Sequence, residues 1–299
     1  MRIAHVTTDF YGKLLSEALR LEFEVDDFQA WGDIKDHHKY DMTIVEYLGA
    51  EAINATKRSV SKNLVLRTRG VEVYEGHLRK IIWAHVKWLL TLGEHQVDYF
   101  ERRWHRLGCK PYNIDWLPQV APLEKFELRK DPKENNNVAM LSNITGRKGS
   151  DRIPEFLLRY PNKRIEHYGT ICAYGYSVQE FVRWRLEKLG LSDRYKHREN
   201  VSFDKISEWL ENKTYLFFPS IAEGLGRAVL ECMCKGVKPI IRNYKGASEL
   251  WPSQLLYNDI KDIDRIMDLQ YEPEAYRKFV EDRYSKQAIL NKFKDIFGL

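Results

Sequence analysis

The sequence has 299 residues, of which 43% are hydrophobic and 30% are charged. Its 8 Trp, 17 Tyr and 13 Phe supply enough apolar volume for two cores of ordinary size, which excludes a disordered chain. The formal net charge of +5 suits an anionic ligand or an anionic membrane face. It is too small for a dedicated nucleic-acid-binding protein.

The cysteines and the apolar runs bear on the compartment. Four cysteines show no regular spacing of the kind that indicates a disulfide framework: Cys109, Cys172, Cys232 and Cys234. We therefore expect reduced, buried thiols and a cytoplasmic setting. No segment approaches the ~20 apolar residues of a transmembrane helix. Residues Met1–Val6 predict a first strand, because they lack the apolar core of a signal peptide.

In the first half of the chain, strand-like runs alternate with helix-like runs, which is typical of a parallel sheet covered by helices on both faces. The predicted strands are Arg2–Thr7, Glu24–Phe28, Met42–Tyr47, Asn63–Arg67 and a short strand that ends at Leu117. The predicted helices are Lys13–Leu21, Ala50–Val60, His77–Leu90 and Glu94–Leu107.

A polar, aperiodic stretch at Arg129–Asn137 then predicts a connection between domains, after which the alternation restarts. The predicted strands of the second half are Val138–Leu141, Arg164–Tyr168, Thr214–Phe218, Lys238–Arg242 and Leu255–Tyr257. The predicted helices are Asp151–Tyr160, Val178–Leu189 and Arg227–Lys235, followed by a charged helical segment at Pro273–Phe297.

The pattern predicts an α/β chain of two Rossmann-like domains that face each other across a cleft, a usual place for ligands. We expect an N-terminal domain at residues 1–126 and a second domain at residues 127–275. Residues 276–299 are expected to form a helix that packs back on the first domain.

The most informative segment reads strand, glycine-bearing turn, helix and strand over Phe217–Ile241. Glu223 lies in the turn, at the carboxyl end of a strand, where such folds bind ligands. Gly224 and Gly226 let backbone N–H groups approach a ligand closely. The positive end of the helix that follows favours a diphosphate. Glu231, farther along this helix, is able to accept two hydrogen bonds from the vicinal hydroxyls of a ribose.

These residues resemble the Glu-x7-Glu signature of the retaining GT-B glycosyltransferases, in the family 4 (group 1) set that includes sucrose-synthase-like and lipopolysaccharide enzymes. Phe-Pro-Ser before Glu223 and Lys-Gly-x-x-Pro before the next strand stand in register with it. Residues 143–149 are similar to the Gly-Arg…Lys-Gly loop of the family, and residues 246–249 to its Gly-x-x-Glu. The resemblance covers residues 110–298 well and the first hundred residues by pattern only.

The resemblance implies a role for each matching residue. Glu223 would contact hydroxyls of the donor sugar, and Glu231 would bind the ribose. Lys148 matches the phosphate-binding lysine, whereas Asn143 stands where the family has an arginine, so that Arg147 would supply the missing charge. The remaining donor-binding residues are Gly224, Leu225, Gly226 and Arg227.

The implied reaction moves a sugar from a UDP- or GDP-sugar to an acceptor with retention of configuration. Lys148, Arg147 and the helix terminus stabilise the negative charge that grows on the diphosphate, so no metal or other cofactor is required. The acceptor, a glycan, a lipid-linked molecule or another compound, is not specified by the sequence, and a nucleic-acid partner is not expected.

Three other segments carry residues that suit a functional role. Asp262 and Asp264 mimic a metal-binding Asp-x-Asp, but at a helix start they are better explained by the helix dipole. Arg69 and Glu72 follow a strand of the first domain, and Glu72 is the candidate there for accepting an acceptor proton. The apolar stripe of His77–Leu90 indicates core packing, with a peripheral contact to a membrane as the alternative.

Two alternatives to the enzyme assignment remain open. The basic, aromatic-rich first domain also suits a glucosyltransferase that acts on modified bases in DNA. Asn143 at the arginine position also suits a protein that binds a nucleotide sugar or a glycan without catalysis.

Overall fold

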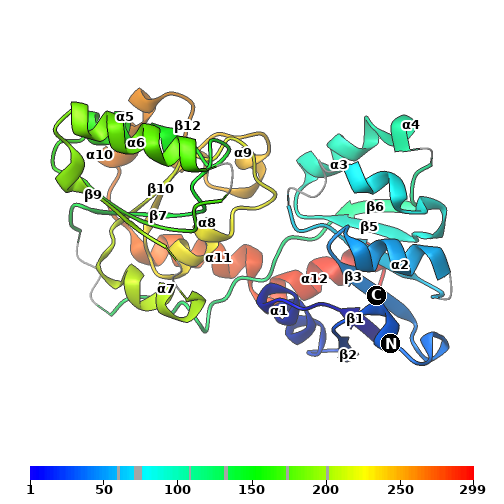
Figure 1. Cartoon of the computed structure of the whole chain (residues 1–299). Helices are drawn as coiled ribbons and strands as arrows, with labels where there is room; N and C mark the ends of the chain where they lie inside the picture. Colours follow the sequence, from blue (N-terminus) through cyan, green and yellow to red (C-terminus); the bar gives the residue numbers. More distant parts are fainter. Residues whose placement is uncertain (59–60, 71–75, 108, 131–133, 173–174, 200–201) are drawn as a thin grey trace. The chain divides into compact units, whose positions relative to one another are not determined.

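The computed structural model describes residues 1–299 except 59–60, 71–75, 108, 131–133, 173–174 and 200–201. The chain divides into two compact units. Unit 1 comprises Met1–Ala121 and Asp282–Leu299, and unit 2 comprises Pro122–Glu281. Within the described residues, each unit contains one sheet of six parallel strands with helices around it (Figure 1). The predicted α/β class with two Rossmann-like domains is confirmed.

Unit 1 has the strand order β2-β1-β3-β4-β5-β6. Its elements are β1 (Arg2–Val6), α1 (Phe10–Leu19), β2 (Glu24–Phe28), β3 (Met42–Glu46), α2 (Ala50–Arg58), β4 (Leu64–Arg67), β5 (Trp88–Thr91), α3 (Glu94–Glu101), α4 (Trp104–Leu107), β6 (Asn113–Trp116) and, from the far end of the chain, α12 (Lys286–Phe297). Every residue of β3 and β4 is buried, as expected for central strands of a parallel sheet.

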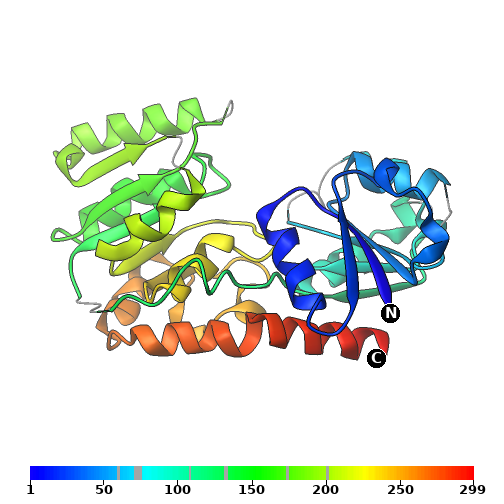
Figure 2. The same cartoon turned by 90° about the horizontal axis from the view of Figure 1, so that it is seen from below.

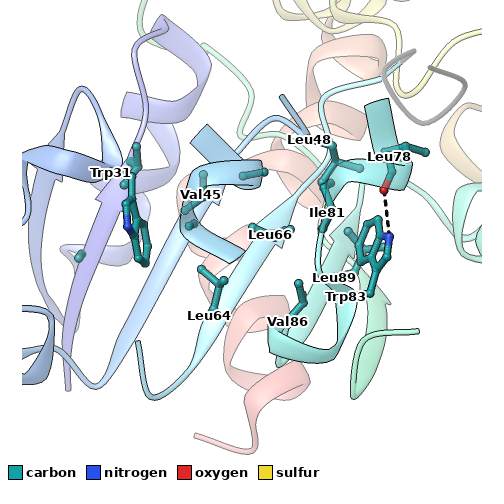
Figure 3. Packing of buried hydrophobic residues seen from close by; sticks show 14 of the residues in the cluster. Trp31, Val45, Leu48, Leu64, Leu66, Leu78, Ile81, Trp83, Val86 and Leu89 are labelled. Carbon is teal, nitrogen blue, oxygen red and sulfur yellow. Dashed lines mark hydrogen bonds between the residues drawn. The ribbon is translucent and has the colours of Figure 1, made fainter. Parts of the chain in front are cut away.

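The core on one face of this sheet gathers residues of β3, β4, α2, α3 and the segment before β5 (Figure 3). Trp83 is fully buried there; its indole N–H donates to the Leu78 carbonyl at 3.2 Å, and its ring meets Phe100 edge-on. The aromatic side chain therefore buries its area without leaving its polar atom unsatisfied.

The predicted helix at His77–Leu90 is wrong. The segment instead forms short 3₁₀ turns at Gly76–Lys80 and Trp83–His85 and then enters β5, which pairs with β4. Of the predicted apolar stripe, Leu78, Ile81, Val86 and Leu89 are buried, as core residues of turns and a strand, whereas Ile82 is exposed. Because this segment is not one helix, the alternative of an amphipathic membrane helix at this position is also wrong.

The opposite face of the sheet is covered by α1 and α12, which lie side by side (Figure 2). Ile289, Leu290 and Phe293 of α12 are fully buried. The predicted helical segment Pro273–Phe297 is two helices, α11 (Pro273–Tyr284) and α12, because Ser285 caps the second one through the backbone N–H of Ala288.

Unit 2 has the strand order β12-β11-β10-β7-β8-β9. Its elements are β7 (Asn137–Leu141), α5 (Ile153–Arg159), β8 (Arg164–Tyr168), α6 (Tyr176–Lys188), β9 (Tyr195–Arg198), α7 (Phe203–Trp209), β10 (Tyr215–Phe218), α8 (Arg227–Cys234), β11 (Lys238–Arg242), α9 (Ala247–Leu250), β12 (Leu256–Tyr257), α10 (Ile263–Asp268) and most of α11. Helices α5, α6 and α10 cover one face of the sheet, and α7, α8 and α11 cover the other (Figure 1). Strand β9 and helix α7 were not predicted.

Candidate functional site

Two loops meet at the carboxyl end of the sheet in unit 2. Strands β7 and β10 are parallel neighbours, with Tyr215 opposite Val138, so the segments that follow them leave the same edge of the sheet. We call residues 142–149 the β7 loop and residues 219–226 the β10 loop. The backbone N–H of Ile221 donates to the Arg147 carbonyl at 2.9 Å and ties the two loops together.

The side chains of three predicted site residues converge here. The Lys148 ammonium lies 2.5 Å from Oε1 of Glu223. An Arg147 guanidinium nitrogen lies 3.7 Å from the same oxygen and donates to the Ala222 carbonyl at 2.9 Å. The exposed fractions of these side chains are 9% for Glu223, 18% for Lys148 and 38% for Arg147. Two cations thus share one carboxylate, which leaves a positive charge in excess at the loop edge.

Burial and neighbouring cations make Lys148 an unusual lysine. Burial lowers its pKa below the ordinary value, the Glu223 carboxylate opposes this shift, and Arg147 and Arg227 add to the lowering. Arg227 begins α8, so its charge acts on the same cluster. An anion that enters this group of cations would relieve their mutual repulsion.

Glycines set the course of both loops. Gly226 has φ 98°, which disfavours any residue with a side chain, and it is the N-cap of α8 without a side-chain hydrogen bond to the helix. Gly149 has φ 69°, and a Cβ on it would stand 2.3 Å from the Pro219 carbonyl oxygen. The β7 loop therefore approaches the β10 loop closely only because residue 149 is glycine. The predicted use of Gly224 and Gly226 for backbone approach stays a prediction.

The other predicted donor-binding residues lie at the same end of the sheet. Asn143 is exposed in the β7 loop, and Arg227 is exposed in the first turn of α8. Leu225 is buried, and Glu231, one turn after Arg227 on α8, is 5% exposed. Both carboxylates of the Glu-x7-Glu pattern are thus largely enclosed by protein.

Sequence reasoning missed the residues that hold these loops. The Tyr244 hydroxyl donates to the Leu225 carbonyl at 2.9 Å and accepts from the Trp251 indole N–H at 2.9 Å. These bonds join the β10 loop to the segment after β11. Neither residue carries a sequence signal for this role, because the partners are distant along the chain.

His167 on β8 fixes the start of the β7 loop. Its Nε2–H donates to the Ser142 carbonyl at 2.9 Å, and its Nδ1 accepts from the Tyr195 hydroxyl at 3.1 Å. Burial lowers the pKa of His167 to about 3, so the ring is neutral at pH 7. A histidine within a predicted strand was the only available signal.

The remaining candidates have other surroundings. Arg69 is 3% exposed and pairs with Glu46 and Asp9, while Glu72 lies outside the described residues. Asp262 accepts backbone N–H bonds from residues 258 and 259 at the start of α10, and Asp264 pairs with Arg159.

Three further observations concern metals, membranes and thiols. Among the described residues, no group of three or more His, Cys, Asp or Glu is placed to hold a metal ion. In the same part of the chain, no helix combines the length and apolar character needed to cross a bilayer. All four cysteines are free thiols; Cys232 and Cys234 are buried as expected, whereas Cys109 is exposed and Cys172 is half-buried.

Comparison with known sequences links unit 2 to a family. Residues 123–253 match the family described as glycosyl transferases group 1. Protein CapJ of Staphylococcus aureus is 23% identical over 205 residues, which cover 65% of this chain and 48% of CapJ. The matched region thus spans about half the length of that relative.

Comparison with solved structures covers the whole chain. A glycosyltransferase from Rickettsia africae ESF-5 superposes with a TM-score of 0.70 at 14% identity, over 99% of this chain and 97% of that one. Anabaena Alr3699/HepE in complex with UDP and glucose gives 0.70 at 13% identity over 100% and 99%. The sucrose-phosphate synthase of Thermosynechococcus elongatus gives 0.71 at 14% identity over 100% and 98%. The family match thus lies within unit 2, and the chain as a whole has the two-domain GT-B fold of these glycosyltransferase structures.

Proposed function

We propose that the protein is a retaining glycosyltransferase that moves a sugar from a UDP- or GDP-linked donor to an acceptor without a metal ion. The observation that carries the proposal is the Lys148–Glu223–Arg147 cluster at the carboxyl ends of β7 and β10, directly before the N-terminus of α8. The UDP in the Anabaena complex favours UDP as the first nucleotide to test.

The cations and the helix terminus serve the diphosphate. Lys148, Arg147 and the first N–H groups of α8 bind its oxygens, where negative charge grows as the leaving group departs. Asn143 adds a side-chain amide at the position where related enzymes carry an arginine. Lys148 and Arg147 are already held at the loop edge, by Glu223 and by the Ala222 carbonyl, before the donor binds.

Glu223 serves first the lysine and then the sugar. Its carboxylate, 9% exposed, holds Lys148 in place until the diphosphate takes over the ammonium group. Glu223 then accepts hydrogen bonds from donor hydroxyls, and Glu231 does the same for the ribose. The backbone of Gly224, Leu225 and Gly226 lines the sugar and phosphate.

In the transfer itself, the acceptor oxygen forms a bond to the anomeric carbon while the bond from that carbon to the diphosphate breaks. The electron pair leaves with the nucleoside diphosphate, and a diphosphate oxygen takes the proton of the acceptor hydroxyl. In this proposal, residues 127–275 hold the donor, residues 1–126 hold the acceptor, and residues 276–299 return to the acceptor side. The free thiols support a cytoplasmic site of action, at a membrane surface if the acceptor is lipid-linked.

The test combines binding with turnover. UDP and GDP are compared for the rise in melting temperature that they cause, and transfer or hydrolysis is followed with radiolabelled nucleotide sugars. Glu223→Gln is expected to lower turnover on the order of 10²-fold, while Glu180→Gln on the exposed face of α6 is the matched control. If the unmodified protein binds the nucleotide but shows no turnover, it is a nucleotide-sugar-binding protein and not an enzyme. Strong, salt-dependent binding to duplex DNA would favour a DNA-modifying enzyme.

A further inference from the structure

Tyr47 has an unusual backbone at a distinctive place in unit 1. Its φ is 68°, a conformation that residues with side chains rarely adopt and that costs energy. Tyr47 directly follows β3, and β1 lies between β2 and β3 in the sheet. The chain therefore leaves β1 toward one side and β3 toward the other. The carboxyl ends of two such strands form the crevice in which open α/β sheets bind ligands.

The Tyr47 side chain is held in a fixed position. Its hydroxyl donates to Asp9 at 2.7 Å, and the Arg69 guanidinium carbon lies 5.2 Å from the centre of its ring. The Asp9 carboxylate in turn accepts from the Arg69 guanidinium at 2.6 Å and from the backbone N–H of Gly12 at 2.8 Å. Even so, 38% of Tyr47 stays exposed. A tyrosine that served only the core would be buried.

The support beneath Tyr47 is a buried network of charges. Arg69 donates to Glu46 at 2.5 Å, and Arg67 donates to the same carboxylate at 2.8 Å. Burial alone would raise the pKa of Glu46, but Arg67 and Arg69 hold it well below its ordinary value, so the carboxylate stays ionised. The ionised Glu46 carboxylate therefore holds the Arg69 guanidinium in place, and this guanidinium in turn packs against the Tyr47 ring.

Beside this network, the Thr7 hydroxyl has no hydrogen-bond partner within the part of the chain that the structure describes. A Cβ on Gly12 would stand 1.8 Å from Oγ1 of Thr7 and 2.8 Å from a guanidinium nitrogen of Arg69, so these two side chains lie close together. Thr7 is 6% exposed, and its hydroxyl lacks a hydrogen-bond partner among the described residues. Buried hydroxyls are ordinarily satisfied, so an orphan at the carboxyl end of β1 points to a polar ligand.

We infer that Tyr47 is a stacking platform for a sugar ring of the acceptor, with Asp9 and Thr7 beside it to bond sugar hydroxyls. This inference rests on the proposed function and names a saccharide as the acceptor class. One face of a pyranose ring is apolar and its rim is polar, which matches a fixed aromatic ring bordered by a carboxylate. The same carboxylate would repel the phosphates of DNA, and a single ring set between Asp9 and Arg69 offers too little apolar area for a lipid chain.

Binding is tested on the full chain by saturation-transfer NMR with methyl glycosides of glucose, galactose and N-acetylglucosamine, with UDP present. Tyr47→Gly removes the ring and relieves the positive φ, and its melting temperature is measured beside that of the unmodified protein to show that it folds. We expect it to weaken binding of the preferred glycoside about tenfold and to leave UDP affinity unchanged. Tyr47→Phe keeps the ring and is expected to retain most of the binding. Tyr112→Ser, which removes another exposed tyrosine of unit 1, is the control.

Each outcome decides between readings. Equal glycoside binding by the unmodified protein and by Tyr47→Gly overturns the inference, as does the absence of binding by every glycoside while UDP binds. If the unmodified protein binds a glycoside through Tyr47 but neither binds nor turns over a nucleotide sugar, the proposed function fails and the sugar platform stands.

Discussion

The hydroxyl of Tyr244 gives a direct test of how the β10 loop is held. It bonds the Leu225 carbonyl and the Trp251 indole N–H, both at 2.9 Å, and all three residues are at most 4% exposed. Tyr244→Phe removes both bonds while it keeps the ring and its packing. The two partner groups then lose this oxygen in a place that water does not reach.

The magnitude follows from the burial. A buried donor or acceptor that loses its partner costs about 1–3 kcal/mol, so two of them cost about 2–6 kcal/mol. For a unit of this size the loss corresponds to a drop in melting temperature of about 4–24 °C. Leu225 lies between Gly224 and Gly226, so we also expect weaker binding of UDP, since the backbone that lines the diphosphate is no longer fixed.

The assay is urea unfolding followed by tryptophan fluorescence, together with calorimetric titration of UDP. The control is Tyr276→Phe, because the Tyr276 hydroxyl in the same unit makes two longer bonds, each 3.3 Å, to the Gln270 carbonyl and the Glu272 N–H. We expect it to cost less than about 1 kcal/mol. If Tyr244→Phe costs no more than Tyr276→Phe and leaves UDP affinity unchanged, the reasoning about the loop is refuted.

Three more predictions concern single positions. Gly149→Ala places a Cβ 2.3 Å from the Pro219 carbonyl oxygen, so it should lower the free energy of unfolding by about 2–4 kcal/mol and remove much of the turnover. Gly190→Ala, at φ 67° with open space around it, is the control and should lower it by only about 1 kcal/mol in the same unfolding assay. His167 keeps a pKa of about 3 when folded and about 6.5 when unfolded, so the unfolded chain takes up a proton as pH falls through 6.5 and the folded chain does not. The free energy of unfolding therefore decreases as the pH is lowered through this window. Between pH 7 and pH 5 the unmodified protein should lose about 2 kcal/mol more of this free energy than His167→Gln does. An equal loss in both proteins would show that the buried ring is not the cause. Ser285→Ala removes the cap of α12 and should lower the free energy of unfolding by about 1 kcal/mol, against no change for an exposed serine such as Ser248.

The strands were the most predictable part of the fold. Central strands such as β3, β4, β8 and β11 consist of short runs with turn residues at both ends, and their bounds were predicted to within a residue or two. Strand β9 was missed because its residues Tyr195–Arg198 are polar and half of them face solvent at the edge of the sheet.

The structure of the segment before β5 was predicted wrongly for a physical reason. The apolar residues of the stripe fall at spacings that suit a helix: Leu78, Ile81, Ile82, Val86 and Leu89. All of them except Ile82 are buried. Successive tight turns bury the same side chains, however, and a short apolar run such as Trp88–Thr91 does not reveal by periodicity whether it is a strand or part of a helix. Only pairing with β4, more than twenty residues earlier, decided the outcome.

One part of the candidate site was predictable from the sequence and another part was not. The proximity of Lys148, Arg147 and Glu223 was within reach of sequence reasoning, because loops that leave adjacent parallel strands meet at one edge. The residues that hold the two loops in place could not be predicted in this way. Tyr244 finds its carbonyl partner 19 residues away and His167 finds its partner 25 residues away, contacts that exist only after the sheet has formed.

The placement of α12 affects how the chain folds during synthesis. The sheet of unit 1 is complete once residue 116 has left the ribosome, yet the helix that lies along α1 emerges only after all of unit 2. In the nascent chain, the apolar surface of α1 therefore stays exposed to solvent while some 160 residues are translated. The neighbouring Phe23 is exposed for the same time, because its ring partner Phe293 belongs to α12. The first unit to be made is the last to be finished, and a fragment that stops at residue 121 should be recovered in aggregates unless residues 282–299 are supplied as a separate peptide.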